Sequence, residues 1–415
     1  MVNIRSLGNT KSSLFSTISF ATILFLILLT ISVFSNFFLQ SIYKEETRVS
    51  LTHKSHFQFR SSSLPTLSYS VEEKITEAYN INRDSLIPPI NATEQERIAW
   101  FKEKLRAFDV FKSTKLTSQF AERARKFLDN TCEVQFFMTW ISPARSLRQR
   151  EILVLESVFK AHPHGCLMIL SSTMDSIHGN RILKPLQDLG FRVIAVKPDL
   201  SFLLKNTPAE AWFRQMKKGN KDPGEIPLAQ NLSNLLRLAV LYKYGGAYLD
   251  IDFIVIKKLS GLRNSIGAQS MDAETGKWSR LNNAVLIFDK NHPLLFKFIE
   301  EFSLTFDGNK WGHNGPYLVS RVIERVRRRP HYNFTVLPSM AFYPVHWNRI
   351  TGFFQKPVDP AMSRWVSAKL LQLSEETYGV HLWNRQSSDL RIGEGSIIGR
   401  LISDHCVLCE DIYNA

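Results

Sequence analysis

The stretch "LYKYGGAYLDIDFIVIKKL" (residues 241–259) places two aspartates, Asp250 and Asp252, in an apolar run typical of a buried β-strand. With the two-residue period of a strand, both carboxylates would share one face with Tyr248 and Ile254. Ionised carboxylates are costly to bury without a compensating partner. Like charges this close repel unless a cation neutralises them, and hard divalent metals readily take oxygen ligands. The pattern therefore predicts a metal site on this strand.

A long amphipathic helix precedes the strand, in "PLAQNLSNLLRLAVLYKYGG" (227–246). Its apolar residues form one stripe, and Gly245 stands where a left-handed C-cap belongs. Ser233, Asn234 and Arg237 fall at helical spacing on a common face away from that stripe. Because Arg237 is flanked by leucines, it either pairs with a core carboxylate or offers its guanidinium donors to a ligand.

An Asp-x-Asp pattern alone is weak, because chance matches to so short a pattern are common. In one alternative, Arg237 and neighbouring N–H groups simply satisfy the two carboxylates. In another, the pattern belongs to a haloacid-dehalogenase phosphatase, where Gly and Thr usually follow the second aspartate. Here "DIDFIVI" (250–256) continues as a strand and no Gly-Asp-x-x-Asp motif comes after it, which argues against the phosphatase.

Strand and helix patterns alternate from residue 131 onward. The runs "EVQFFMTW" (133–140), "CLMIL" (166–170) and "FRVIAV" (191–196) indicate strands, with helical patterns between them. This rhythm predicts an α/β fold with a mostly parallel sheet flanked by helices. Open sheets of this kind bind ligands beyond the C-terminal ends of their strands. Trp140 stands at such an end, where it either caps the core or stacks on a nucleobase.

The N-terminus carries an apolar segment, residues 14–39, without a charged residue. Crossing a bilayer needs about 20 apolar residues. No small-residue cleavage site comes after it, so we expect an uncleaved signal-anchor rather than a cleaved signal peptide. Basic residues flank the segment on both sides, so the positive-inside rule is indecisive. Since the bulk of the chain lies C-terminal to it, we expect a cytosolic tail over 1–13 and a lumenal remainder.

The region 40–130 is expected to form a lumenal stem, because it begins Ser-rich, polar and punctuated by prolines. The catalytic domain is expected over 131–415. Amphipathic helical patterns within 94–128 either belong to the stem or pack on the catalytic domain.

The four cysteines, Cys132, Cys166, Cys406 and Cys409, all lie C-terminal to the apolar segment. A lumenal compartment permits disulfides, with three possible connectivities. Cys132 and Cys166 each precede a predicted strand, so they would lie close together if those strands are parallel neighbours. We therefore predict a Cys132–Cys166 disulfide. The Cys406-x-x-Cys409 pair has no second half-site for zinc, which favours a local disulfide or free thiols.

Glycosylation sequons occur at Asn91 and Asn333, which we predict as glycan sites. Asn231 also matches the sequon but lies in the predicted helix. The formal net charge of +14 and the pI near 9.6 suit an anionic substrate or membrane surface. No basic-aromatic block indicates a nucleic-acid module, so we expect no nucleic-acid partner.

Taken together, these residues resemble family 32 glycosyltransferases. The region around 225–260 resembles their DXD-containing sugar-binding region. The region around 280–410, with "KWGHNGPYLVSRV", "FYPVHW" and "YGVHLWNRQS", resembles the α-1,4-glycosyltransferase region of lactosylceramide 4-α-galactosyltransferase relatives and their uncharacterised plant members. The resemblance implies a GT-A fold and retaining transfer from a UDP-sugar with Mn²⁺.

The resemblance also implies roles for the polar residues near the Asp-x-Asp pattern. Asp252 would ligate the metal, and Asp250 would contact the ribose and the sugar or the metal. Arg237, Ser233 and Asn234 would hold donor-sugar hydroxyls. Many relatives carry Asp at the position of Asn234, which leaves the donor sugar open.

Further roles fall on residues outside that region. Asn283 and Tyr248 would contact the donor, Trp140 would stack on the uracil, and His381 would be the third metal ligand. The acceptor side is expected at His313, Asn314 and Gly315. From sequence alone, His381 is equally a satisfied core residue and the Asn-Gly-Pro run an ordinary turn.

The resulting hypothesis is a Golgi type II membrane glycosyltransferase, with galactose the expected sugar and a glycan or glycolipid the acceptor. Mn²⁺ would offset the charge developing on the leaving UDP. The alternative is a catalytically silent Golgi protein of the same fold that binds a glycan or nucleotide. Retention of Asp250, Asp252 and Arg237 together favours the enzyme.

Overall fold

The structure is a computed structural model that describes residues 86–89 and 91–414. The predicted tail (1–13), the predicted signal-anchor (14–39) and the first part of the predicted stem lie outside the described residues. Within the described part of the chain, no helix is both long enough and apolar enough to cross a bilayer.

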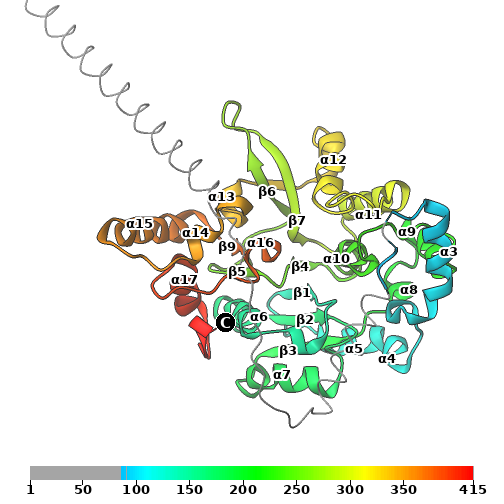
Figure 1. The fold of residues 1–415 in the computed structure, drawn as a ribbon, viewed down its shortest axis with the longest axis horizontal. Coiled ribbons are helices and arrows are strands. Elements are labelled where there is room, and N and C mark those ends of the chain that lie inside the picture. The colour runs from blue at the N-terminus through cyan, green and yellow to red at the C-terminus, as the bar shows by residue number, and fades with distance from the viewer. Residues whose placement is uncertain (1–85, 90, 415) are drawn as a thin grey trace, which may run out of the picture. The chain divides into compact units, whose positions relative to one another are not determined.

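A seven-stranded sheet forms the centre of the fold, with the strand order β3-β2-β1-β4-β7-β6-β8 (Figure 1). Its strands are β1 (Gln135–Thr139), β2 (Cys166–Leu170), β3 (Arg192–Val196), β4 (Gly246–Leu249), β6 (Ser265–Met271), β7 (Trp278–Phe288) and β8 (Thr335–Leu337). Neighbouring strands are parallel except where β7 pairs with β4 and with β6. The predicted α/β fold with a mostly parallel sheet is thus confirmed.

Both faces of the sheet are buried under helices. Successive side chains of a strand point in opposite directions, so each strand contributes to both apolar cores. In β1, Phe136 and Met138 enter one apolar core and Phe137 enters the other. The first core is covered by η3 (Ala144–Ser146), α6 (Gln149–Ala161), α7 (Ile177–Asp188), α13 (Ser339–Phe342), α14 (Thr351–Phe354), α15 (Pro360–Glu376) and α17 (Ile397–His405). The second is covered by α3 (Glu94–Lys104), η2 (Asp109–Phe111), α5 (Phe120–Phe127), α8 (Leu200–Leu203), α9 (Ala209–Lys217), α10 (Leu228–Tyr244), α11 (Pro293–Thr305), α12 (Pro316–Val326) and η4 (Pro330–Tyr332).

A second, two-stranded sheet pairs β5 (Phe253–Val255) antiparallel with β9 (Gly379–His381). The remaining short helices are η1 (Leu105–Ala107), α4 (Lys115–Ser118), η5 (Trp347–Arg349), α16 (Asn384–Ser387) and η6 (Ile412–Asn414).

The helices of 94–128 pack on the globular body, which was one of the two possibilities open for them. Phe101 of α3 and Phe120 of α5 are fully buried in the second core. Arg97 donates to both carboxylate oxygens of Asp222, at 2.9 and 2.5 Å. Apolar burial and a two-point ion pair therefore both fix this segment to the catalytic body.

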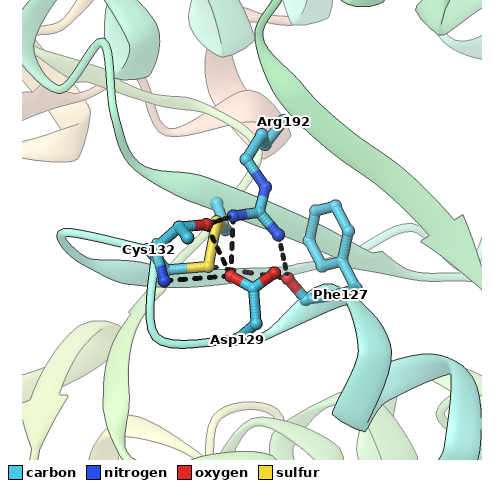
Figure 2. The surroundings of a disulfide bond; sticks show 6 residues. Phe127, Asp129, Cys132 and Arg192 are labelled. Atoms are coloured by element: carbon cyan, nitrogen blue, oxygen red, sulfur yellow. Dashed lines mark hydrogen bonds and ion pairs between the residues drawn. A yellow bond between two sulfur atoms is a disulfide. The ribbon is translucent and has the colours of Figure 1, made fainter.

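The predicted disulfide joins Cys132 to Cys166, with Cα atoms 5.5 Å apart. Figure 2 shows how the preceding turn is held: Arg192 at the start of β3 donates to Asp129 at 2.8 Å and to the Phe127 carbonyl at 2.6 Å. Cys166 begins β2 and Arg192 begins β3. The disulfide and the Arg192 hydrogen bonds therefore both attach the segment at the end of α5 to the starting edge of the sheet. Cys406 and Cys409 form a second disulfide.

The Asp-x-Asp strand differs from the prediction. A single strand was expected through both aspartates, but β4 ends at Leu249 and residues 250–252 form a turn. The Phe253 N–H closes this turn onto the Asp250 carbonyl at 3.1 Å. The chain leaves the large sheet here and joins β9 in the small one. The two carboxylates therefore lie in the turn that connects the two sheets, and not on an apolar face of a continuous strand.

Candidate active site

Helix α10 leads into the site and ends in two glycines. Gly245 and Gly246 have φ of 74° and 108°, in the region that favours glycine. A Cβ on Gly246 would lie 2.4 Å from the Gln135 carbonyl oxygen of β1. The pair thus allows α10 to turn sharply into β4, which delivers Asp250 to the C-terminal edge of the parallel strands.

Three side chains with oxygen or nitrogen ligand atoms meet at this edge. The ligand atoms of Asp250, Asp252 and His381, which we call the acidic trio, all lie within 4.8 Å of one another. His381 Nε2 is 3.3 Å from Asp252 Oδ1 and 3.9 Å from Asp250 Oδ2. The strand pair β5–β9 causes this approach, because Phe253 and His381 are register partners.

The geometry of the acidic trio suits a divalent cation. Such ions hold carboxylate oxygen and imidazole nitrogen at about 2.0–2.2 Å, so atoms separated by the distances above can share one ion. Asp252 is 8% exposed and His381 7% exposed, so water alone does not solvate these polar groups. Two acids and an imidazole are a donor set that Mn²⁺ and similar ions accept.

Neighbouring groups fix the orientation of the trio. The Asn384 N–H donates to Asp252 Oδ2 at 2.8 Å, and Tyr248 Oη donates to Asp250 Oδ1 at 2.9 Å. The Trp383 N–H donates to His381 Nδ1 at 3.2 Å, so the neutral imidazole carries its proton on Nε2, which faces the carboxylates. Trp383 itself adopts φ 57°, an unusual conformation for a bulky residue at this turn.

Burial and charge act in opposite directions on the trio. Burial alone would raise the pKa of Asp250, but Arg237 and His381 outweigh it and hold that pKa below its usual value. Burial alone would lower the pKa of His381, yet the Asp252 and Asp250 carboxylates raise it above its usual value. The charges beside Asp250 and His381 thus oppose the effect of burial on the pKa of each.

Arg237 is buried and pairs with a carboxylate, the first of the two possibilities that the sequence left open. Its Nη1 lies 3.1 Å from Asp250 Oδ1 and donates to the Asn283 carbonyl at 2.8 Å. Its guanidinium also lies 4.5 Å from the centre of the Tyr248 ring. Arg237 therefore joins α10, β4 and β7 at the site.

The other predicted donor-side residues of α10 lie beside Arg237. Asn283 Nδ2 donates to Asn234 Oδ1 at 2.8 Å, and Ser233 Oγ donates to the Gln230 carbonyl at 2.8 Å. A Cβ on Gly315 would lie 2.7 Å from Asn234 Oδ1, so the backbone of Gly315 packs directly on this amide pair.

The other residues of the predicted acceptor loop make internal contacts. Asn314 is 2% exposed and links the Asn231 side chain to the Asp307 carbonyl, at 2.9 and 2.8 Å. His313 Nε2 lies 2.7 Å from the Thr305 carbonyl. Asn314 and His313 therefore shape the loop.

Trp140 follows β1 at the C-terminal edge of the sheet and is half-buried. Its Nε1 donates to the Pro143 carbonyl at 3.1 Å, and its ring packs against the first core. Of the predicted glycan sites, Asn91 and Asn333 are exposed, whereas Asn231 is 4% exposed within α10.

Two further residues lie at the site and were not predicted from the sequence. The Asn384 N–H anchors Asp252, as described above, and Tyr343 is buried with its ring 5.8 Å from that of His381. Burial, reinforced by the Asp250 charge, raises the pKa of Tyr343. The two residues lie in the stretches "FYPVHW" and "YGVHLWNRQS", but neither stretch has a periodicity that points to the trio.

A shallow cavity of about 620 Å³ lies at the C-terminal end of α10 and is lined by Lys243 and Tyr244 among others. None of the acidic trio lines this cavity, so it is separate from the site.

Two family models match the chain. The glycosyltransferase sugar-binding region containing DXD motif matches residues 148–272, and the alpha 1,4-glycosyltransferase conserved region matches residues 287–413. Lactosylceramide 4-alpha-galactosyltransferase of Mus musculus is 31% identical over 275 residues, which cover 63% of this chain and 70% of that protein. The chain belongs to this glycosyltransferase family.

Other relatives of the family match different shares of the chain. An uncharacterised protein of Arabidopsis thaliana is 31% identical over 296 residues, 69% of this chain but only 44% of that protein. Among solved structures, PaToxG glycosyltransferase is 20% identical with a TM-score of 0.35, covering 67% of this chain and 86% of that one. The chain thus spans less than half of the Arabidopsis relative.

Proposed function

We propose that this chain is a retaining, Mn²⁺-dependent glycosyltransferase with a GT-A fold. It moves a hexosyl unit, galactose, from a UDP-sugar to a glycan or glycolipid acceptor and forms an α linkage. The observation that carries the proposal is the acidic trio, in which Asp250, Asp252 and His381 bring their ligand atoms within 4.8 Å of one another. The name of the mouse relative supports the choice of galactose.

In this proposal the acidic trio holds the cation and α10 holds the donor sugar. When bound, Mn²⁺ supplies Lewis-acid stabilisation of the departing UDP diphosphate. The Asn384 N–H fixes Asp252, and the β5–β9 pairing holds His381 beside it. To bind the cation through Nε2, His381 would carry its proton on Nδ1. Arg237 keeps the Asp250 carboxylate ionised, which leaves Asp250 able to contact both the cation and the donor.

Donor-sugar hydroxyls are assigned to the amides of Asn234 and Asn283 and to Ser233. Asn283 donates to Asn234, so the amide pair arrives already oriented and loses little entropy on binding. Trp140 stacks on the uracil at the end of β1. Gly315 closes the pocket on the acceptor side.

The acceptor hydroxyl attacks from the face that the diphosphate leaves, so the α configuration is retained. Asp250 and Asp252 are the carboxylates of the site, and contacts with Arg237, His381 and the Asn384 N–H already engage them. Both are assigned to the cation in this proposal and neither is placed as a covalent nucleophile, which favours front-face substitution. A trapped glycosyl adduct on the enzyme would overturn this mechanism.

We place the catalytic body in the Golgi lumen, anchored by residues 14–39 as a type II membrane protein. The two disulfides and the exposed sequons Asn91 and Asn333 suit an oxidising, glycosylating compartment. Enzymatic release of the Asn91 and Asn333 glycans, read by mass spectrometry, tests this placement.

The function is tested with the full-length protein in detergent. UDP-sugar hydrolysis and transfer are measured for a panel of UDP-hexoses with and without Mn²⁺, for wild type and Asp252→Ala. The proposal requires metal-dependent turnover by wild type only. The alternative, a silent glycan- or nucleotide-binding protein, is supported if wild type binds UDP but neither protein turns over any donor.

A further inference from the structure

Two exposed aromatic side chains lie beside the site, each stacked with an arginine. Trp311 is 50% exposed and Tyr317 is 42% exposed. The Arg385 guanidinium lies 4.0 Å from the centre of the Trp311 ring, and that of Arg280 lies 4.5 Å from the centre of the Tyr317 ring. We call these four residues the aromatic rim.

The two rings of the rim flank one turn. The Tyr317 N–H donates to the Gly312 carbonyl at 3.1 Å, and Gly312 adopts φ 73°. A Cβ on Gly312 would lie 3.1 Å from the Tyr317 ring, so the ring lies directly against this turn. Trp311, which precedes Gly312, and Tyr317 thus belong to one closed turn that leads into α12.

Both arginines of the rim lie close in the sequence to residues of the site. Arg385 immediately follows Asn384, whose N–H binds Asp252, and adjacent Cα atoms are about 3.8 Å apart. Arg280 lies on β7, three residues before Asn283, the partner of Asn234. The loop that carries Trp311 and Tyr317 also packs on the donor side, because Gly315 lies directly against Asn234.

The rim arginines have unused hydrogen-bond donors. Within the described residues, neither Arg280 nor Arg385 forms a side-chain hydrogen bond or an ion pair, and each is held by its stacking partner. Stacking restricts a guanidinium while leaving its N–H groups available. Donors at the edge of an aromatic face match a sugar ring, which has an apolar C–H face and a rim of hydroxyls.

We propose that the aromatic rim is the acceptor subsite, in which a pyranose ring of a carbohydrate acceptor stacks on Trp311 while Arg385 binds its hydroxyls. Tyr317 and Arg280 extend the same surface to the next sugar unit. The inference rests on the proposed function and deepens it. It also assigns acceptor contact to Trp311 instead of His313 and Asn314, whose side chains contact Thr305 of α11 and Asn231 of α10.

The test separates the acceptor from the donor. Full-length wild type, Trp311→Ala, Trp311→Phe and Arg385→Ala are compared, with Trp365→Ala on α15 as a control at another exposed tryptophan. Two rates are measured: UDP-sugar hydrolysis without acceptor, and transfer to methyl β-lactoside and a panel of methyl hexosides. We expect Trp311→Ala to raise the acceptor KM about tenfold, as expected for loss of an aromatic anchor.

The other variants sharpen the result. Trp311→Phe keeps a ring and should recover part of the affinity, whereas Trp365→Ala should behave as wild type. Donor hydrolysis should stay within about twofold of wild type in all of them, because none contacts the acidic trio. An unchanged acceptor KM in Trp311→Ala, or an equal loss of donor hydrolysis, overturns the acceptor subsite.

The two proposals can fail separately. If wild type does not hydrolyse any UDP-sugar with Mn²⁺, the proposed function fails. If wild type hydrolyses the donor but transfers to no glycoside of the panel and binds none of them by saturation-transfer NMR, the acceptor subsite fails. A change in UDP affinity alone would assign Trp311 to the nucleotide instead.

Discussion

The described residues contain two groups of three potential metal ligands. Each brings three ligand atoms within 4.8 Å of one another: the acidic trio, Asp250, Asp252 and His381, and a cysteine trio, Glu156, Cys406 and Cys409. In the cysteine trio both sulfurs are joined in a disulfide, and Glu156 Oε2 accepts three backbone N–H groups at 2.9, 2.9 and 3.0 Å.

The difference lies in the contacts that already satisfy each group. Glu156 on α6 accepts the consecutive N–H groups of residues 407–409. This carboxylate therefore attaches the segment after α17 to α6. In the acidic trio, Asp250 Oδ2 and Asp252 Oδ1 face His381, and neither accepts a backbone N–H from the part of the chain that the structure describes. Proximity of potential ligands is therefore common to both groups. The disulfide distinguishes them, because it leaves Cys406 and Cys409 no thiolate to bind a metal.

The largest expected effect is on the acidic trio. Asp252→Asn should lower metal-dependent UDP-sugar hydrolysis about 1000-fold, because it removes a charged ligand where charge develops on the leaving group. Hydrolysis is measured as UDP release during Mn²⁺ titration. Asp188→Asn, which breaks only an exposed ion pair with Lys184, is the matched control and should keep wild-type rates. Equal rates in Asp252→Asn and wild type would remove the distinction between the two trios.

The corresponding change in the cysteine trio should affect stability only. Glu156→Ala leaves three N–H groups without their acceptor, and we expect the free energy of unfolding to fall by about 3 kcal/mol. Denaturant unfolding measures this loss. The Mn²⁺ concentration for half-maximal donor hydrolysis, taken well below the unfolding temperature, should not change. A shifted Mn²⁺ requirement would show that Glu156 belongs to a functional metal site.

Loss of the imidazole should weaken the metal rather than abolish turnover. In His381→Ala the two aspartates remain, so the Mn²⁺ concentration for half-maximal hydrolysis should rise about 10- to 100-fold. High Mn²⁺ should restore part of the rate. A variant with unchanged Mn²⁺ requirement would assign His381 to core packing, where its ring contacts Tyr343 and Trp383.

The smallest expected effect is that of the short disulfide. Its cysteines are separated by three positions, so replacing both Cys406 and Cys409 with Ala should lower the free energy of unfolding by about 2 kcal/mol. Calorimetry measures the change, and donor hydrolysis should stay at the wild-type rate. A loss of hydrolysis greater than the loss of folded protein would connect this disulfide to the active site.

Local patterns predicted much of the fold. The alternating runs after residue 131 predicted the parallel strands, because strand and helix periods are written in consecutive residues. The same reasoning placed Cys132 beside Cys166 at the start of β1 and β2. The apolar stripe of α10 predicted which of its residues are buried, and its polar face predicted that Arg237 and Asn234 lie together.

The site itself could be predicted only in part. The two-residue period suggested that Asp250 and Asp252 share a face of one strand. In the structure a turn places them side by side, because the next strand, β5, pairs with β9 in the smaller sheet. The pairing partner of β5, strand β9, lies more than a hundred residues further along the chain. No local pattern encodes a register across such a separation, so His381 was predicted as a ligand only through family resemblance and Asn384 was missed.

The junction between the two sheets also has a consequence for synthesis. A ribosome makes Asp250 and Asp252 long before β9, so a nascent chain carries both acids without the histidine that faces them. A protein truncated before Gly379 would keep the whole seven-stranded sheet and both aspartates but lack β9 and the Asn384 N–H. The proposed cation site is therefore completed only when nearly all of the chain has been translated. A premature stop codon before Gly379 would remove β9 together with α17, which covers the first core.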